Sequence, residues 1–505
     1  MTQHLKNGTR LAAVDLGSNS FRLEIGWLEQ GLVHRSEYFK ETVRQGNGLN
    51  EAGQLSSDAM QRGWECLARF GERLAGFAPQ QVRAVATQTL REARNREVFL
   101  RRAEALLGFP IDVIAGREEA RLIYEGVARL LPESNERRLV IDIGGRSTEM
   151  ILGQGLKAQV MESWGLGSVA WSMRFFADGQ LDAAAFNRAD IAAKAILEEA
   201  LQDFGRDKWD TAYGASGTVG AVCDALTAAG WPSGDVTREG LDWLLERLLK
   251  AGSVERLKIE GMKEDRKAVV GGGLAILRAA FDLLEIDTLH AAQGALRHGA
   301  LYDLLDRQDM ATDLRTGTVA RLTGKFGVDT AQAGRVSRIA RQLLAMSSAD
   351  SGGGSGQLEE ERIARKLDWA AQLHEIGLHI SHHDHHKHGA YILDNADAPG
   401  FAMHELHRLS LLVLGHRGKL KKLEAELGDA DFARQLLTLR LAVIFCHARR
   451  VPELKSFSLK SLGPGFVLAC SDAGWASAFP QSAHLLREEA LAWQKTPRPL
   501  TLLRL

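Results

Sequence analysis

LAAVDLGSNSFRLEIGWL, at residues 11–28, and RRLVIDIGGRSTEMILGQ, at residues 137–154, share one plan. Each has an apolar run that reaches an Asp, then a turn of small residues, then a second apolar run. This pattern predicts a buried strand, a tight turn and a second strand. Because Asp15 and Asp142 hold the same place, 127 residues apart, we predict the internal duplication of a whole domain.

Strand and helix patterns alternate from residue 11 to about residue 306, which is typical of an α/β fold. Beyond that point helical periodicity dominates, and SADSGGGSGQ, at residues 348–357, has the composition of a flexible linker. A strand-like segment then begins at Phe457. We therefore predict four domains: two α/β domains at 1–134 and 135–306, a helical domain at 307–450, and a small α+β domain at 451–505.

The bulk composition restricts the class of protein and the kinds of partner. The 505 residues carry 63 basic and 64 acidic side chains, so the formal net charge is -1. An anionic ligand must therefore be held by local clusters or backbone amides, and we expect no nucleic acid partner. The four cysteines form no CxxC pair, which favours a reducing compartment. The sequence lacks a signal-peptide pattern and an apolar run of transmembrane length, so we expect a cytoplasmic protein.

The two Asp-bearing turns suggest phosphate chemistry. Glycine lets backbone N–H groups approach a phosphate closely, because no Cβ intervenes. An Asp at the end of the strand repels phosphate directly but can hold Mg²⁺, which then bridges to it. The alternative is two ordinary hairpin turns, and the repetition of the whole motif favours the binding site.

Three further stretches admit both a structural and a functional interpretation. Residues 214–218, GASGT, lie between a predicted strand and a predicted helix, where they form either an anion cradle or a tight turn. Residues 271–273, GGG, permit close packing or hinge motion, or contact a ligand. Glu118 and Glu119 stand in the first turn of a predicted helix, where they stabilise its dipole or orient an attacking water.

Six motifs in a fixed order give the chain a family resemblance. They are DLGSNSFRL at 15–23, ATQTLREARN at 86–95, GREEARLIYEGV at 116–127, DIGGRSTE at 142–149, GASGT at 214–218 and GALRHGALY at 294–302. Together they resemble the exopolyphosphatase and guanosine pentaphosphate phosphohydrolase family, within the fold group of actin, sugar kinases and Hsp70. The resemblance implies two duplicated actin-like (RNase H-like) α/β domains, an all-α domain similar to HD phosphohydrolases and a small C-terminal α+β domain.

The resemblance also implies roles for individual residues. Glu119 matches the base that activates water, and Glu149 and Arg91 match other catalytic positions. Mg²⁺ is the implied cofactor, with K⁺ as a second cation to test as an activator; its ligands are Asp142 and Glu149, supported through water by Asp15. The implied phosphate-binding residues are Gly17, Ser18, Asn19, Arg22, Gly144, Gly145, Ser147, Gly214, Ser216 and Gly217.

The chain departs from the family pattern at three places. Arg146 stands where the family motif has a small residue, and it either adds a phosphate contact or points away. Gln293 and His298 replace acidic residues around the GALR motif. These changes affect details of metal or nucleotide handling rather than the core reaction.

The helical region is rich in imidazoles. His374-Glu375 stands where an HD domain has His-Asp, and the matching upstream His is missing, so we expect a helical scaffold without a working metal centre. The run HISHHDHHKH, at 379–388, is a solvated loop, a tract that binds adventitious metal, or part of an anion path. By resemblance to long exopolyphosphatases, a polyphosphate channel at a homodimer interface would use His382, His388, Arg417, Lys419, Lys421, Lys422 and Arg449.

Three functions remain open at this point. The first is an exopolyphosphatase that removes terminal phosphate from inorganic polyphosphate, which KHGAYIL and GHRGKL between 387 and 420 favour by resemblance. The second is a guanosine pentaphosphate 5′-phosphohydrolase. The third is an ATP-binding actin-like or Hsp70-like module, or a polyphosphate sensor, without phosphohydrolase activity.

Overall fold

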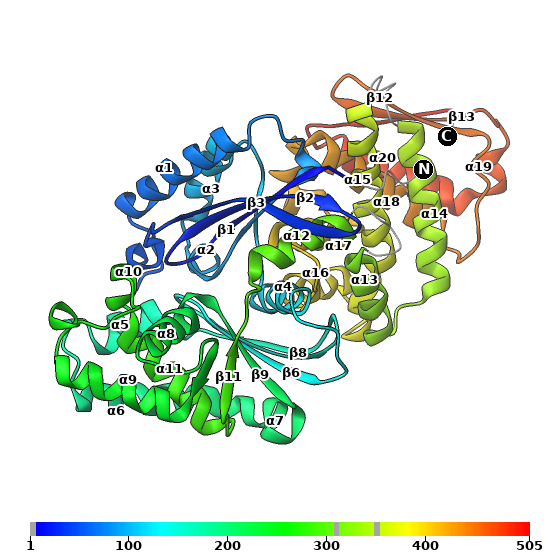
Figure 1. The fold of residues 1–505 in the computed structure, drawn as a ribbon. Helices are drawn as coiled ribbons and strands as arrows, with labels where there is room; N and C mark the ends of the chain where they lie inside the picture. Colours follow the sequence, from blue (N-terminus) through cyan, green and yellow to red (C-terminus); the bar gives the residue numbers. More distant parts are fainter. Residues whose placement is uncertain (1–6, 308–312, 348–353) are drawn as a thin grey trace. The chain divides into compact units, whose positions relative to one another are not determined.

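A computed structural model describes residues 7–307, 313–347 and 354–505. The chain divides into two compact units, Met1–Asp313 and Leu314–Leu505 (Figure 1). The first is a mixed α/β unit with two sheets, and the second is mostly helical with one small sheet. The unit boundary lies after Asp313, a short distance beyond the predicted boundary at 306, and the boundaries at 134 and 450 remain predictions.

The first sheet has the strand order β3-β2-β1-β4-β5. β1 and β2 are antiparallel with Asp15 opposite Arg22, whereas β1, β4 and β5 run parallel. Helices α1 and α3 lie together on one side of this sheet (Figure 1). The strands are β1 (Arg10–Leu16), β2 (Phe21–Glu29), β3 (Leu32–Glu41), β4 (Val82–Ala86) and β5 (Ile111–Val113), and the helices are α1 (Ser57–Arg73), α2 (Gln88–Glu92), α3 (Arg96–Leu107) and α4 (Gly116–Ala128).

The second sheet repeats this topology. Its order is β10-β11-β9-β6-β7-β8, so β8-β7-β6-β9-β11 corresponds to β3-β2-β1-β4-β5. β6 and β7 are antiparallel with Asp142 opposite Glu149, and β9 and β11 run parallel to β6. The strands are β6 (Arg137–Ile143), β7 (Thr148–Gln154), β8 (Lys157–Trp164), β9 (Thr211–Ala215), β10 (Asp235–Thr237) and β11 (Thr288–Ala291). The predicted repeat of strand, Asp, turn and strand is confirmed in both sheets.

Strand alternation explains why helices cover both faces of the second sheet. Leu139 and Ile141 pack with α11, whereas Val140, between them, packs with α4 on the other face. The helices of this part are α5 (Ser168–Phe175), α6 (Ala183–Leu197), α7 (Leu201–Phe204), α8 (Ser216–Ala228), α9 (Arg238–Ala251), α10 (Glu264–Lys267), α11 (Val270–Leu283) and α12 (Leu296–Asp306). The Gly271–Gly273 stretch lies inside α11 and packs against Phe176, Ser172 and Thr218, in line with the close-packing interpretation.

Helices α4 and α12 join the two lobes of the first unit. α4 follows the first sheet in sequence but packs on β7 and β8, and α12 follows the second sheet but packs on β1 and β4. The two helices also contact each other, and a Cβ at Gly299 would overlap the backbone of Leu122. Close approach of these backbones therefore requires glycine at 299.

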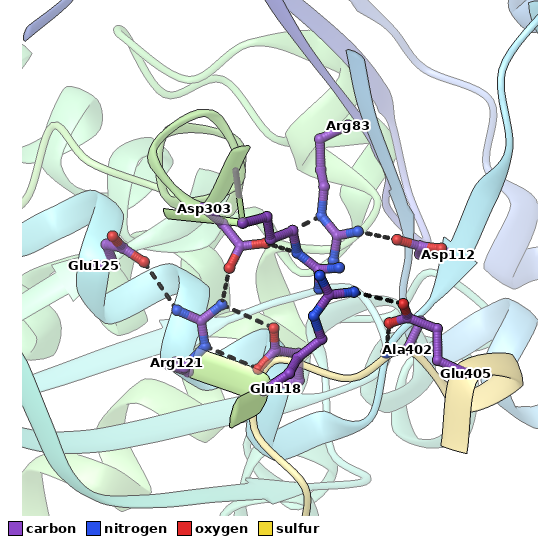
Figure 2. A network of polar contacts seen from close by, with 10 residues as sticks. Arg83, Asp112, Glu118, Arg121, Glu125, Asp303, Ala402 and Glu405 are labelled. Carbon is purple, nitrogen blue, oxygen red and sulfur yellow. Dashed lines mark hydrogen bonds and ion pairs between the residues drawn. The ribbon is translucent and has the colours of Figure 1, made fainter. Parts of the chain in front are cut away.

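A buried ion network fixes this helix pair. Arg121 of α4 donates to Glu118 and Glu125 in its own helix and to Asp303 of α12, with an Nη2–Oδ1 distance of 2.6 Å (Figure 2). Asp303 also accepts from Arg307, and Arg83 of β4 lies 3.3 Å away. These arginines hold the pKa of Asp303 below its usual range despite its burial.

The second unit is a helical assembly with a small sheet of order β12-β13-β14. Its core gathers buried residues from every long helix, including Trp369, Leu412 and Leu437. In the same unit, Arg315 donates to Glu405, whose other oxygen accepts from the Ala402 N–H at the start of α17 (Figure 2). The elements are α13 (Leu314–Lys325), α14 (Thr330–Ser347), α15 (Gly354–Leu373), α16 (His385–Asn395), α17 (Met403–Gly415), α18 (Ala430–Phe445), β12 (Phe457–Leu462), β13 (Gly465–Cys470), α19 (Trp475–Ala478), α20 (Pro480–Trp493) and β14 (Leu500–Leu503).

The predicted linker at 348–357 is only partly testable. Residues 348–353 lie outside the described residues, and residues 354–357 form the first turn of α15. The prediction was therefore wrong for these last four residues, where the helix continues through glycine and serine ahead of the strong helix formers that follow. None of the helices in the described part of the chain has the length and apolar character needed to span a membrane.

Asp303→Asn should destabilise the first unit by about 3 kcal/mol, because it leaves buried arginines without their shared carboxylate. The measurement is the urea midpoint, followed by hydrogen exchange of peptides from α4 and α12. Asp242→Asn is the matched control, since the Asp242 carboxylate is 54% exposed and pairs with Arg278 at the surface. Equal midpoints for the two variants would contradict a joining role for Asp303.

Candidate active site

A cavity of about 390 Å³ opens in the first unit where the turns of both sheets meet. The turn after β1, the turn after β6, the start of α8 and the segment before α12 all contribute to its lining. Of the predicted site residues, those that line it are Asp15, Gly17, Ser18, Asn19, Arg22, Glu119, Asp142, Gly144, Gly145, Ser147, Ser216 and Gly217. The volume lies within the range of small-molecule sites.

The turn after β1 presents hydrogen-bond donors to this cavity. Arg22 donates to Asp15 at 2.9 Å, and Thr89 donates to the Ser18 hydroxyl at 2.8 Å. Asn19 Nδ2 and Ser20 Oγ are buried and have no hydrogen-bond partner within the described residues. Buried polar atoms of this kind need a partner, so both are available to an anionic ligand.

The turn after β6 packs directly against the turn after β1. Gly144 N–H donates to Ser147 O at 2.9 Å, and the Gly145 carbonyl accepts from Val169 N–H at 2.8 Å. A Cβ built on Gly145 would lie 3.0 Å from Ser18 Cβ and 3.4 Å from Asn19 N. Glycine at 145 therefore allows the turn after β6 and the turn after β1 to approach each other.

The third wall of the cavity is the junction of β9 and α8. Ser216 has a φ of 84°, a left-handed conformation that residues other than glycine rarely adopt. Its hydroxyl and that of Thr218 both donate to the Ile143 carbonyl, at 2.9 and 2.8 Å, which holds the strained turn in place. The N-terminus of α8 is thereby aimed at the cavity, a favourable site for an anion.

Four carboxylates gather around the cavity with little exposure to water. Asp15, Glu119, Asp142 and Glu149 are each less than a tenth exposed. Burial, with repulsion from Glu119 next in size, raises the pKa of Asp142 to about 7. Burial also raises the pKa of Glu149 and of Glu119, and Arg91 opposes the rise at Glu119 by donating to its Oε2 at 3.1 Å.

Three predicted residues lie behind the cavity wall rather than in it. Arg91 reaches Glu119 and the Ile114 carbonyl, and Glu149 accepts from the Ser163 hydroxyl at 2.7 Å. Gly214 is buried within β9, where a Cβ would meet Leu289 and Val219 at 2.7 Å. The geometry gives Arg91 and Glu149 supporting positions, and it gives Gly214 a packing role instead of the predicted phosphate contact.

The cavity also has a basic side, which was not predicted from the sequence. Lys40 of β3 binds Asp265 of α10 at 2.9 Å, and Lys263 and Arg266 line the same region. The Arg266 guanidinium lies against Gly217, its side chain is 12% exposed, and Asp265 is 4.0 Å from its Nε. Burial lowers the pKa of Arg266 and of Lys40. In the sequence these groups belong to the short charged run KEDRK at 263–267, and only folding brings that run beside the turns after β1 and β6.

The carboxylates around the cavity supply the oxygen ligands that Mg²⁺ prefers. Across the described ranges, no three His, Cys, Asp or Glu side chains approach closely enough to form a metal site by themselves. Mg²⁺ usually binds one or two carboxylates and completes its shell with water and substrate phosphates. Asp142 fits this mode of binding, because it lines the cavity and because Glu119, Asp15 and Glu149 place further carboxylates around the same cavity.

The three departures from the family pattern have clear positions. Gln293 lines the cavity, whereas His298 binds Glu24 at 3.1 Å and caps the first turn of α12. Arg146 is not among the cavity-lining residues; it binds Glu92 at 3.1 Å and the Gly46 carbonyl at 3.2 Å. Of the two predicted alternatives, the structure favours the one in which Arg146 points away from the phosphate.

Comparison with known proteins identifies the family. Residues 30–308 match the model of the Ppx/GppA phosphatase family, and residues 314–490 match that of Ppx/GppA phosphatase, domain III. The chain belongs to the Ppx/GppA phosphatase family. This membership makes it a phosphoanhydride hydrolase and confirms the resemblance seen in the six sequence motifs.

Individual relatives of this Ppx/GppA phosphatase cover nearly its whole length. It is 38% identical over 496 residues to the guanosine-5′-triphosphate,3′-diphosphate pyrophosphatase of Vibrio parahaemolyticus, which is 97% of each chain. The protein of the same name from Vibrio atlanticus is 39% identical over 484 residues, 95% of each chain. A solved exopolyphosphatase from Cytophaga hutchinsonii is 25% identical, with a TM-score of 0.54, over 59% of this chain and 98% of that one.

The second unit gathers histidines around buried ring contacts. His374, His385, His386 and His416 are buried, and the His416 ring centroid lies 5.4 Å from those of both His374 and His385. The Nδ1 atoms of His374 and His416 lie 2.7 and 2.6 Å from the carbonyls of Ala371 and Val413. Burial lowers the pKa of all four imidazoles, that of His386 to about 4.

The predicted channel residues fall into different surroundings within this unit. Arg417 lies 3.4 Å from His385 Nδ1, and Lys422 Nζ donates to the Arg417 carbonyl at 3.4 Å. Arg449 instead binds Asp329 and Glu375, which neutralise it. The other predicted residues are at least partly exposed: His382, His388, Lys419 and Lys421. The structure groups Arg417 and Lys422 with the histidines and places Arg449 in separate ion pairs.

Gly145→Ala should lower kcat/KM for phosphate release about tenfold to hundredfold, because the new methyl group forces the turn after β6 away from the turn after β1. Gly165→Ala is the matched control: it lies between β8 and α5, and a Cβ there meets nothing within 4 Å. Steady-state assays of both purified variants measure the effect. Full activity of Gly145→Ala would contradict the importance of this contact.

Acid should weaken the second unit through its buried histidines. Below about pH 6.5 these histidines take up protons in the unfolded chain but not in the folded chain, because burial lowers their pKa. The stabilisation is therefore present above pH 6.5 and is lost as the pH falls, until His386 protonates near pH 4. Urea midpoints followed by circular dichroism at pH 7 and pH 4.5 measure this loss. His386→Gln should reduce the difference between the two midpoints, and His447→Gln, at an exposed position, should leave it unchanged.

Proposed function

We propose that this Ppx/GppA phosphatase removes the terminal 5′ phosphate of guanosine pentaphosphate. The observation that carries the proposal is one cavity with an acidic side, at Asp142 and Glu119, and a basic side, at Lys263 and Arg266. A nucleotide with phosphates at both ends of its ribose suits such a cavity, since the reacting phosphate and the other diphosphate need separate binding groups. The names of the two Vibrio relatives support the same substrate.

The residues of the cavity suggest how the reaction proceeds. Backbone amides of the turns after β1 and β6, together with Asn19 Nδ2 and the N-terminus of α8, would bind the terminal phosphate. Glu119 lines the cavity and would accept a proton from the attacking water, which it orients toward phosphorus. Arg91 holds Glu119 in position and favours its ionised form.

Mg²⁺ is the cofactor that we propose for this site. Asp142 would hold it, with Glu149 behind and Asp15 in support. When bound, the cation would neutralise charge on the phosphate oxygens. K⁺ remains a cation to test as an activator.

We also propose that the two lobes are duplicated actin-like domains, because they share strand order and the placement of Asp15 and Asp142, and that the second unit supplies an HD-like helical scaffold at a homodimer interface.

Inorganic polyphosphate is the second candidate substrate. The sequence placed it first, and the full-length Vibrio relatives reverse that order. Support for polyphosphate comes from the Cytophaga hutchinsonii exopolyphosphatase and from the basic cluster of Arg417 and Lys422. Both substrates end in the same phosphoanhydride, so one catalytic site suffices for either.

Phosphate release should be faster from guanosine pentaphosphate than from long-chain polyphosphate at equal concentrations of phosphate ends. Glu119→Gln should lower kcat about 100-fold to 1,000-fold on either substrate while retaining binding, because it removes the proton acceptor and keeps the shape of the side chain. Phosphate release and isothermal titration measure the two effects.

Glu104→Gln is the matched control, because Glu104 binds the Ile111 N–H outside the cavity. The same assay with EDTA, and with Mg²⁺ restored, tests the cofactor. A clear preference for polyphosphate would overturn the proposed substrate, and an active Glu119→Gln enzyme would overturn the assignment of the base.

A further inference from the structure

Arg146 connects the two lobes of the first unit, although it does not line the cavity. It belongs to the turn after β6 in the second lobe, and both of its partners belong to the first lobe. Its Nε donates to Glu92 Oε2 of α2 at 3.1 Å, and its Nη1 donates to the Gly46 carbonyl at 3.2 Å. The Arg146 side chain is 18% exposed and that of Glu92 is 35% exposed, so the contact is partly open to water.

The Gly46 contact leads to the first phosphate-binding turn. Gly46 N–H donates to the Ser18 carbonyl at 2.7 Å, and Arg44 N–H donates to the Asn19 carbonyl at 2.8 Å. A Cβ on Gly46 would lie 3.2 Å from both Arg146 Cδ and Ser18 Cβ. Arg146 therefore rests on the segment that supports the backbone of Ser18 and Asn19.

The Glu92 contact leads to the proposed base. Gln88 donates from Nε2 to Glu92 Oε1 at 2.5 Å, and its Oε1 accepts from Arg91 Nη2. Arg91 in turn donates to Glu119 Oε2 at 3.1 Å. An unbroken series of hydrogen bonds thus runs from Arg146 through Glu92, Gln88 and Arg91 to Glu119.

We propose that Arg146 is a positioning residue that ties the second phosphate-binding turn to the first and, through Glu92 and Gln88, fixes the orientation of Arg91 against Glu119. This role rests on the proposed function of the site. It accounts for an arginine in a turn of small residues, since a long planar side chain reaches two partners in the other lobe at once. The bond is made only when the lobes are close together, so it favours the closed cleft.

Kinetics of alanine variants test the series of bonds. Arg146→Ala and Glu92→Ala should each lower kcat for release of inorganic phosphate from guanosine pentaphosphate about tenfold, and the double variant should fall no further, because both changes break one connection. KM should stay within about twofold. Arg146→Lys should recover part of the loss. Arg278→Ala, which removes an ion pair within the second lobe, should retain full kcat. If the alanine variants fail to fold, Arg146→Lys and Glu92→Gln are compared instead.

A distance measurement separates the tether from the catalytic proposal. Spin labels at Glu72→Cys on α1 and Glu246→Cys on α9 report the separation of the lobes, and the four native cysteines are buried. Arg146→Ala should broaden the distance distribution toward longer values. An unchanged distribution, an unchanged kcat, or a double variant about a hundredfold slower would overturn the inference. If the unsubstituted enzyme releases no phosphate from guanosine pentaphosphate but Arg146→Ala still broadens the distance distribution, the proposed function is refuted and the tether is retained.

Discussion

Asp15, Glu119, Asp142 and Glu149 are held away from water around one cavity, and this crowding of negative charge governs the first unit. Asp15 and Glu119 are each paired with an arginine, whereas Asp142 and Glu149 have no ion pair within the described residues. Burial, and after it repulsion from neighbouring carboxylates, raises the pKa of both groups. Such repulsion persists in a stable fold only where the surrounding structure is well determined, and sites of this kind commonly bind cations or transfer protons.

The surrounding structure meets that demand by exchanging helices between lobes. α4 covers the sheet of the second lobe and α12 covers that of the first, and Asp303 joins them through Arg121. This buried connection lies behind the cavity, whereas Arg146 connects the two turns at the cavity itself. The lobes are therefore linked twice, once by a buried ion network between two helices and once by a polar contact that is partly open to water.

The parts of this arrangement that depend on local sequence patterns were predictable, whereas the parts that depend on tertiary contacts were not. The strands around Asp15 and Asp142 were predictable because apolar runs and glycine turns are local signals. Glu119 entered through its motif, and the structure places it in the same cavity. Lys263 and Arg266 were missed because a short charged run on a four-residue helix looks like any solvated surface. Gly214 packs inside β9 and does not line the cavity, and the sequence did not reveal this because a packing glycine and a phosphate-binding glycine have the same sequence signature.

The duplicated hairpins also differ in one informative way. Strand pairing sets Arg22 opposite Asp15 in the first lobe and Glu149 opposite Asp142 in the second. Equivalent positions thus carry an arginine in the first lobe and a glutamate in the second. The first pair combines a base with an acid, whereas the second combines two acids. The two lobes have similar backbones but different charges at equivalent positions, so the two ends of the cleft are not equivalent. A linear anion lying across the cleft would therefore not meet two equivalent orientations.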